Sequence, residues 1–350
     1  MRLGQPLLWP LSLPYAALSK ARVAAYRSGI WRSKRLDAAV ISVGNLTVGG
    51  TGKTPMVLWL AERLLSEGKK TGILTRGYGG RSTNSTGANG DPGSTSDEVR
   101  LLKERLGPRV AFGVGADRFA SGQSLLRQGT SWFVLDDGFQ HLQLARDVDI
   151  LLIDANDPFG GGRVLPAGLL REPRSGLSRA DIIVITRTDR APAVESLVRR
   201  YSKAPIFYAQ TKLDGVRSLY DRQWGSHLAP EENRRLFAFC GVGNPSAFVA
   251  DLRRWGFDVA GEKFFPDHHR YTPADEDAIT NAAVAAGATG LVCTEKDIYK
   301  LNQLLYRRPH LFCCVISLQV HRDQEYWRTV MSVAESSLHA HELTLPFPAG

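Results

Sequence analysis

The segment Val40–Pro55, VISVGNLTVGGTGKTP, combines residue types that can bind a chain of phosphates. An apolar run leads into a glycine-bearing turn, and Gly52-Lys53-Thr54 stands where a helix is expected to begin, which is the pattern of a P-loop. In such a loop the backbone N–H groups face the phosphates, the lysine reaches the β- and γ-oxygens, and the following hydroxyl binds Mg²⁺. The predicted nucleotide contacts are Thr47, Val48, Gly49, Gly50, Thr51, Gly52, Lys53 and Thr54, with Thr54 also a predicted magnesium ligand.

Position 47 departs from the strict P-loop pattern, which has glycine where this chain has Thr47. Gly49 and Gly50 still supply two positions at which the backbone is free to take unusual conformations. A glycine-rich turn without a ligand is the alternative interpretation of the segment.

A second motif favours the nucleotide interpretation. The apolar run 132–136, WFVLD, ends in an acid and is followed by Asp137 and then by GFQH. In P-loop proteins a carboxylate at the end of such a strand holds Mg²⁺. Adjacent strand residues point to opposite faces, so we expect one of Asp136 and Asp137 to face the ion and the other to serve the loop or the substrate. A strand followed by an Asp-Gly turn is the alternative.

Length and composition indicate a protein of two domains with ordinary cores. The chain has 350 residues, of which 43% are hydrophobic. Its four cysteines form no C-x-x-C pair and no regular framework, which is typical of reduced, buried thiols in a cytosolic protein.

The N-terminal segment 1–36 concentrates positive charge and apolar residues. It holds seven basic residues and no acidic one, out of a net charge of +9, and no nucleic-acid-binding motif accompanies them. Its apolar run is interrupted by three prolines and is too short for a membrane span, which needs about 20 residues. From Tyr15 onward we expect an amphipathic helix that contacts a membrane surface, with a helix docked on its own domain as the alternative.

Apolar strand-like runs alternate with helical stretches along most of the chain, which predicts a doubly wound, mainly parallel α/β sheet. A first series fills 37–210, the pattern becomes polar in 211–235, and a second, shorter series follows in 236–350. We therefore expect a P-loop core, a linker, and a smaller α/β domain that closes over the site. A Gly/Ser/Thr/Asn-rich stretch at 79–96 is a predicted mobile loop.

Phosphoryl transfer also needs a group that orients the attacking oxygen and takes its proton. The candidates outside the nucleotide loop are Asp97, Glu98, His141, Asp267 and His268. Asp97 follows the predicted mobile loop and His268 lies in a polar DHHR turn of the second domain. A structural role is the alternative for each of them.

The motifs taken together resemble the tetraacyldisaccharide 4'-kinase family of lipid A biosynthesis, from about residue 40 to about residue 318. The resemblance implies ATP-dependent phosphorylation, with Mg²⁺, of the 4'-hydroxyl of a tetraacyldisaccharide 1-phosphate, giving lipid IVA. It also implies a peripheral location on the cytoplasmic face of the inner membrane. The motifs are TVGGTGKTP, TRGYGG (75–80), SDE (96–98), LDDGFQH (135–141), PAGLLREP (166–173), FCGVGNP (239–245), PDHH (266–269) and TEKD (294–297).

The resemblance also assigns roles to side chains. Asp97 would receive the hydroxyl proton, His268 would orient it, and Lys53 would complete the catalytic set. The family's Gly-Asp-Glu-Pro reads Ser-Asp-Glu-Val at 96–99, so the acids are kept and both flanking residues change. The implied magnesium shell is Thr54, Asp136, Asp137 and Glu172, and the implied substrate-binding residues are Arg76, Gln140, His141 and Arg171.

One different class of function stays open. Thr186-Arg187-Thr188-Asp189 follows an apolar run and nearly matches the guanine-reading Asn/Thr-Lys-x-Asp motif, with Arg in place of Lys. The alternative is therefore a membrane-associated ATPase or GTPase switch.

Overall fold

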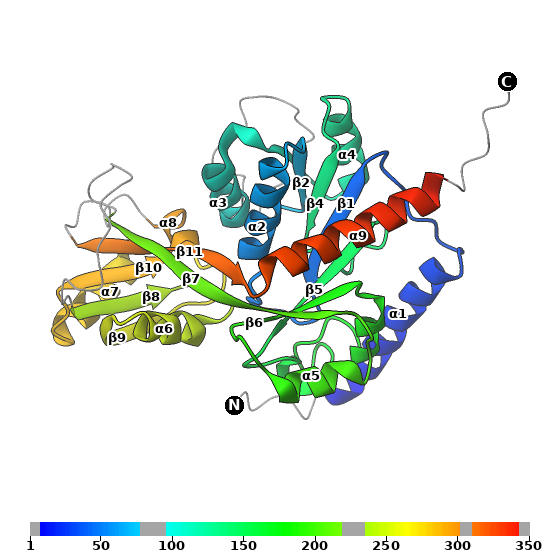
Figure 1. The fold of residues 1–350 in the computed structure, drawn as a ribbon. Helices are drawn as coiled ribbons and strands as arrows, with labels where there is room; N and C mark the ends of the chain where they lie inside the picture. The colour runs from blue at the N-terminus through cyan, green and yellow to red at the C-terminus, as the bar shows by residue number, and fades with distance from the viewer. Residues whose placement is uncertain (1–7, 78–95, 219–234, 302–309, 343–350) are drawn as a thin grey trace, which may run out of the picture. The chain divides into compact units, whose positions relative to one another are not determined.

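The computed structural model describes residues 8–77, 96–218, 235–301 and 310–342. The chain divides into two compact units (Figure 1). The first comprises residues 1–94, 105–210 and 318–350, and the second comprises 95–104 and 211–317. Most of the predicted mobile loop and most of the predicted linker lie outside the described residues.

The strands of the first unit form a parallel sheet in the order β3-β2-β4-β1-β5-β6-β7. The central strands are buried along their whole length, as expected for a parallel sheet covered by helices on both faces. The strands are β1 (Ala39–Asn45), β2 (Thr71–Thr75), β3 (Ala111–Val114), β4 (Trp132–Asp136), β5 (Val148–Asp154), β6 (Ile182–Thr186) and β7 (Ile206–Ser218).

Helices of the first unit begin at recognisable signals. Asp117 caps α4 by accepting a hydrogen bond from the Ala120 N–H at 3.0 Å, and α5 begins at a proline. Near the C-terminus α9 packs against α2 (Figure 1). There the buried Tyr326 hydroxyl lies 3.3 Å from the Met56 sulfur. The helices are α1 (Trp9–Arg27), α2 (Lys53–Ser66), α4 (Arg118–Leu126), α5 (Pro192–Arg199) and α9 (Asp323–Glu342).

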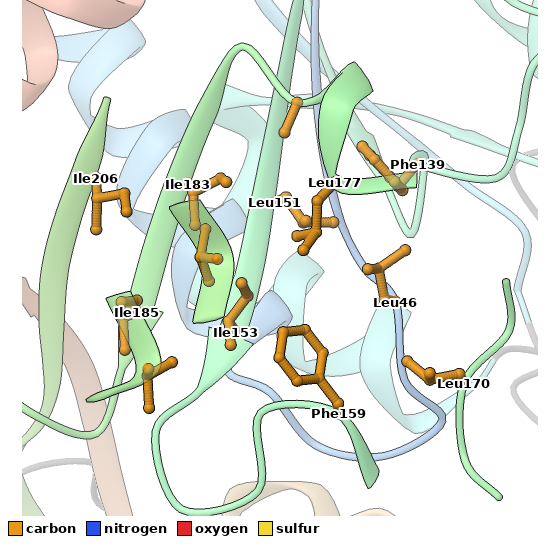
Figure 2. Close-up of a cluster of buried hydrophobic side chains, with 13 residues drawn as sticks. Leu46, Phe139, Leu151, Ile153, Phe159, Leu170, Leu177, Ile183, Ile185 and Ile206 are labelled. Carbon is orange, nitrogen blue, oxygen red and sulfur yellow. The ribbon is translucent and has the colours of Figure 1, made fainter. Parts of the chain in front are cut away.

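One hydrophobic cluster of the first unit includes Leu46, the residue that leads into the predicted nucleotide loop (Figure 2). Leu46, the first residue after β1, packs there with side chains from β5 and β6. Leu170 and Leu177 join the cluster from the segment that carries the LREP motif. The loop and the LREP segment are thus anchored in the same core.

The second unit has strands in the order β7-β11-β10-β8-β9, and its β11-β10, β10-β8 and β8-β9 pairs are parallel. Helix α7 begins with a capping box, in which Thr272 and Asp275 satisfy each other's backbone N–H groups. The elements are α3 (Asp97–Leu106), β8 (Arg235–Cys240), α6 (Pro245–Arg254), β9 (Asp258–Phe264), α7 (Pro273–Ala285), β10 (Gly290–Thr294), α8 (Glu295–Ile298) and β11 (Leu311–Val320).

The structure confirms the predicted α/β class and draws the unit boundaries differently from the sequence. Residues 211–218 belong to strand β7 where a linker was expected, residues 95–104 count with the second unit, and 318–350 return to the first. This return follows from packing, because Tyr326 of α9 is fully buried in the first unit. Helix α1 begins at Trp9, earlier than the expected Tyr15, with Pro10 in its first turn, where proline is tolerated.

Candidate active site

The nucleotide loop joins the end of β1 to the start of α2, as the P-loop motif predicts. Gly49 and Gly52 have φ values of 133° and 87°, in the region where a side chain is strained. No side chain caps the start of α2, and its 14 residues give it the full N-terminal dipole. The arrangement presents backbone N–H groups and positive potential to a phosphate.

Two neighbouring segments hold this loop in place. The Val48 N–H donates to the Leu169 carbonyl at 2.7 Å, and the Arg171 N–H donates to the Leu46 carbonyl at 2.7 Å. Because its N–H already donates to Leu169, Val48 is a less suitable phosphate donor than the sequence predicted. Donors from Gly49 onward are better placed for that role.

The near match to a guanine-reading motif supports the loop from the other side. Thr186 Oγ1 donates to the Thr51 carbonyl at 3.1 Å, and Arg187 donates to the Gly50 carbonyl at 3.2 Å. Arg187 also pairs with Asp154 at 2.9 Å. Thr186 and Arg187 of this motif therefore support the backbone of the P-loop.

Lys53, Asp137 and Arg171 form a charged cluster beside the loop. Lys53 Nζ lies 3.2 Å from Asn45 Oδ1 and 3.6 Å from Asp137 Oδ1. Arg171 Nη1 reaches both oxygens of Asp137, at 2.8 and 2.7 Å. Burial raises the pKa of Asp137, but the nearby Lys53 and Arg171 charges outweigh it and hold the pKa below its ordinary value.

Asp136 and Asp137 occupy different environments, as expected for adjacent residues at a strand end. Asp136 pairs in register with Val43 of β1, is buried, and accepts a hydrogen bond from Thr75 Oγ1 at 3.1 Å. Asp137 leaves the strand with φ of 50°. The buried Thr54 lies in the first turn of α2, after the neighbouring strand β1. A hydroxyl with one or two carboxylates is a donor set that Mg²⁺ accepts together with phosphates.

Glu172 makes a buried ion pair. Its carboxylate receives both nitrogens of the Arg179 fork, at 2.7 and 2.8 Å, and Gln140 Nε2 at 2.9 Å. Gln140 Nε2 also donates to the Asn45 carbonyl at 2.9 Å, which links this pair to the end of β1. Among the described residues, no three His, Cys, Asp or Glu side chains are grouped so as to hold a metal on their own.

The other two predicted substrate residues are Arg76 and His141. Arg76 is exposed and directly follows β2. His141 is partly buried among cations, and burial, followed by the charges of Arg118, Arg146 and Arg22, lowers its pKa to about 4. His141 is therefore neutral at pH 7.

In the second unit, Asp97 and His268 lie together, from positions far apart in the sequence. Asp97 opens α3, and its Oδ1 is 3.2 Å from His268 Nδ1. Its Oδ2 is 2.9 Å from Lys300 Nζ. Burial opposes ionisation of Asp97, yet the contacts with His268 and Lys300 hold its pKa well below the ordinary value. The hydrogen bond to Asp97 raises the pKa of His268 against the effect of burial.

Backbone strain gathers at these sites. Five non-glycine residues in the described part of the chain have positive φ, and Asp137, Arg187 and His268 are three of them. Such conformations cost free energy and concentrate at functional sites. Their local sequence gave no signal of this strain.

Sequence reasoning assigned no site role to Arg179 or Lys300, and it considered Arg187 only as part of the near match to a guanine-reading motif. Arg179 lies seven residues after Glu172, and Lys300 lies one helical turn after the TEKD aspartate, Asp297. Charged residues at such spacings are common on exposed surfaces, so only the contacts distinguish these three.

Helix α1 lies against the LREP segment through polar contacts. Ser12 Oγ donates to the Val164 carbonyl at 3.0 Å and accepts from the Ala167 N–H at 3.1 Å, and the Tyr15 hydroxyl donates to the Arg171 carbonyl at 3.0 Å. No helix within the described ranges has the length and apolar character needed to cross a bilayer. Several large apolar side chains of α1 and of Leu8, the residue before it, are exposed: Leu8, Trp9, Leu11, Leu13 and Leu18.

A parallel α/β sheet, a phosphate loop between β1 and α2, and an acid at the end of the adjacent β4 define a P-loop nucleotide-binding protein. The family model described as LpxK, tetraacyldisaccharide-1-P 4'-kinase, matches residues 4–335, and the chain belongs to this family.

Relatives and a solved structure agree with this assignment. The chain is 41% identical over 333 residues to a tetraacyldisaccharide 4'-kinase of Geobacter metallireducens, covering 91% of this chain and 95% of that protein. It is 39% identical to the protein of the same name from Geobacter sulfurreducens, covering 91% and 90%. A crystal structure described as the "apo" form of LpxK from Aquifex aeolicus in complex with ATP matches with a TM-score of 0.73 at 29% identity, covering 94% of this chain and 99% of that one.

Proposed function

We propose that the protein transfers the γ-phosphoryl group of ATP to the 4'-hydroxyl of a tetraacyldisaccharide 1-phosphate, giving lipid IVA in lipid A biosynthesis. The observation that carries the proposal is a P-loop with Lys53 beside Asp137, in a chain that also pairs Asp97 with His268. Family membership supplies the acceptor, and the relative solved with ATP supports the choice of nucleotide.

Phosphoryl transfer depends mainly on positioning and on neutralising charge. The α2 N-terminus and Lys53 would bind and neutralise the β- and γ-phosphates. Thr54, Asp136 and Asp137 would hold Mg²⁺, which supplies further charge neutralisation when bound. Glu172 is the weakest member of the predicted shell, because Arg179 and Gln140 engage both of its oxygens.

Asp97 and His268 would act on the acceptor hydroxyl as one unit. Asp97 would accept the proton, and His268 would orient the carboxylate and stabilise its charge. The low pKa of Asp97 makes it a weak base alone, so sharing the proton with His268 fits the geometry better than an independent role. We therefore expect Asp97→Asn and His268→Gln each to lower kcat by about 10²-fold, with the double variant little worse.

Arg76, Gln140, His141 and Arg171 stay proposals for acceptor binding. Gln140 and Arg171 already join Glu172 and Asp137, so a ligand bound to them would be positioned relative to the nucleotide loop.

The acceptor assignment is tested by measuring ATP turnover with three acceptors in detergent micelles: the tetraacylated disaccharide 1-phosphate, its deacylated form, and none. We expect product only with the acylated acceptor and hydrolysis at background level without it. Full ATP hydrolysis without an acceptor would favour the switch alternative and overturn the proposal.

A peripheral location at the cytoplasmic face of the inner membrane is the second part of the proposal. Leu11, Leu13 and Leu18 of α1 are 58%, 56% and 71% exposed, in a segment rich in basic residues. Apolar insertion would add to the attraction of each basic residue for anionic lipid, about 1 kcal/mol close to the surface.

Co-sedimentation with anionic and neutral vesicles tests this location. We expect Leu11→Glu/Leu18→Glu to lose binding at all salt concentrations, and neutralisation of Lys20 and Arg27 to lose only the salt-sensitive part. Val284→Glu is a matched control, because Val284 is 73% exposed on α7. Equal binding by all of these variants would contradict a role for α1.

A further inference from the structure

The buried ammonium of Lys300 joins two acidic side chains of the second unit. The side chain is 7% exposed, and its Nζ lies 2.9 Å from Asp97 Oδ2 and 3.9 Å from Asp297 Oδ1. It also donates to the Gly241 carbonyl at 3.1 Å. A lysine is rarely buried to this extent unless its charge is compensated.

Asp297 is the fixed end of this arrangement. It is fully buried, and it accepts hydrogen bonds from Thr294 Oγ1 at 2.6 Å, from the Gly241 N–H at 2.9 Å and from the Tyr271 hydroxyl at 3.0 Å. Three residues from separate parts of the unit, Thr294, Gly241 and Tyr271, thus hold this carboxylate, and the Gly241 carbonyl also holds the lysine beside it. Lys300 Nζ therefore has little freedom to move.

The two oxygens of Asp97 are divided between two partners. Oδ2 faces Lys300 at 2.9 Å, and Oδ1 faces His268 Nδ1 at 3.2 Å. With Oδ2 held by a fixed cation, rotation of the carboxylate would break the ion pair. Lys300 consequently determines which oxygen His268 meets and in which plane.

We propose that Lys300, held by Asp297 and the Gly241 carbonyl, is a positioning residue that orients Asp97 toward His268. Its ammonium also partly neutralises the Asp97 carboxylate that faces the imidazole. The expected effect of Lys300 on kcat rests on the proposed function, whereas its effect on the pKa of His268 does not. Lys300 meets neither nucleotide nor acceptor in this role.

While the Asp97–His268 hydrogen bond is kept, removal of the Lys300 charge changes the pKa of His268 in one direction only. Asp97, Asp267 and Glu98 are the acids that raise the pKa of His268. The Lys300 ammonium partly neutralises the charge of Asp97. Removing the ammonium leaves the Asp97 carboxylate less neutralised, so His268 should hold its proton more strongly. We expect the pKa of His268 to rise by about one pH unit in Lys300→Met, at the lower end of the effect of a close charge because the imidazole is half exposed.

Titration of the histidines by NMR in the full chain measures this directly. The chain has eight histidines, so labelled imidazole carbons give few signals, and His268→Gln assigns the one required. Lys296→Met is the matched control, because it removes the same charge four residues earlier, from a pair with Glu98 at 2.6 Å. The inference is overturned if Lys300→Met moves the His268 pKa no further than Lys296→Met does.

Kinetics give the second readout. Lys300→Met should lower kcat by about 10- to 100-fold with the KM for ATP unchanged, and it should add little in a His268→Gln background. If Lys300→Met does not fold, Lys300→Gln keeps N–H donors, removes only the charge, and is read by the same titration. An altered His268 pKa in a protein without kinase activity would sustain the positioning role while refuting the proposed function. An unaltered His268 pKa in a protein with kinase activity would refute the positioning role and leave the proposed function standing.

Discussion

The Glu172–Arg179 pair allows the energetic role of a predicted metal ligand to be measured. The two side chains are 3% and 10% exposed, and the guanidinium meets both carboxylate oxygens in fork geometry. Arg179 also lies over the Phe139 ring, 4.4 Å from its centroid. Gly176 packs so closely that an added Cβ would come within 2.6 Å of Glu172 Oε2.

These contacts set the magnitude of the expected effects. At about 4 Å and an effective dielectric of about 20, the charges attract by about 4 kcal/mol, which mainly offsets the cost of burying them. Glu172→Met or Arg179→Met leaves one buried charge uncompensated, so each should lower the free energy of unfolding by about 3–5 kcal/mol. The double variant removes both charges and should lose much less than the sum.

Urea denaturation followed by tryptophan fluorescence measures this cycle, with Trp59, Trp132 and Trp327 reporting on the first unit. We expect a coupling free energy of at least about 2 kcal/mol. The exposed pair Arg322–Glu325, at 3.2 Å with side chains 60% and 57% exposed, is the control and should give less than about 1 kcal/mol. Additive losses at Glu172 and Arg179, or a single loss below about 1 kcal/mol, would refute the argument that the carboxylate is committed to the ion pair.

Three further outcomes follow from the same structure. Lys53→Met should fold normally and lose nearly all phosphoryl transfer, since among the described residues its ammonium is paired with Asn45 and Asp137; near-normal turnover would remove it from catalysis. The Asn variants of Asp136 and Asp137 should need unequal Mg²⁺ concentrations for half-maximal rate, because the two acids have different partners, and identical magnesium titrations would contradict this. His141, whose pKa is lowered to about 4, binds a proton more readily in the unfolded chain, so the wild type should lose stability relative to His141→Gln as pH falls from about 6.5 toward 4; parallel pH profiles of the unfolding midpoint would exclude this.

The sequence alone determined the nucleotide loop and the class of fold. Both depend on short-range patterns: glycines and a lysine at fixed spacing, and buried β-rich runs alternating with amphipathic helices. Strand β4 coincides with the predicted apolar run 132–136, because strands buried on both faces require continuous hydrophobic sequence. The family resemblance rested on the same local motifs.

Only the tertiary structure decided which charges meet. Asp97 and Lys300 are 203 residues apart, and nothing in the local sequence shows that Arg179 and Gln140 engage both oxygens of Glu172. The return of α9 to the first unit was equally invisible, since a helix pattern does not say which sheet it covers. Charged side chains at ordinary spacings look alike in sequence, because their burial and their partners are set by distant elements that bring them together.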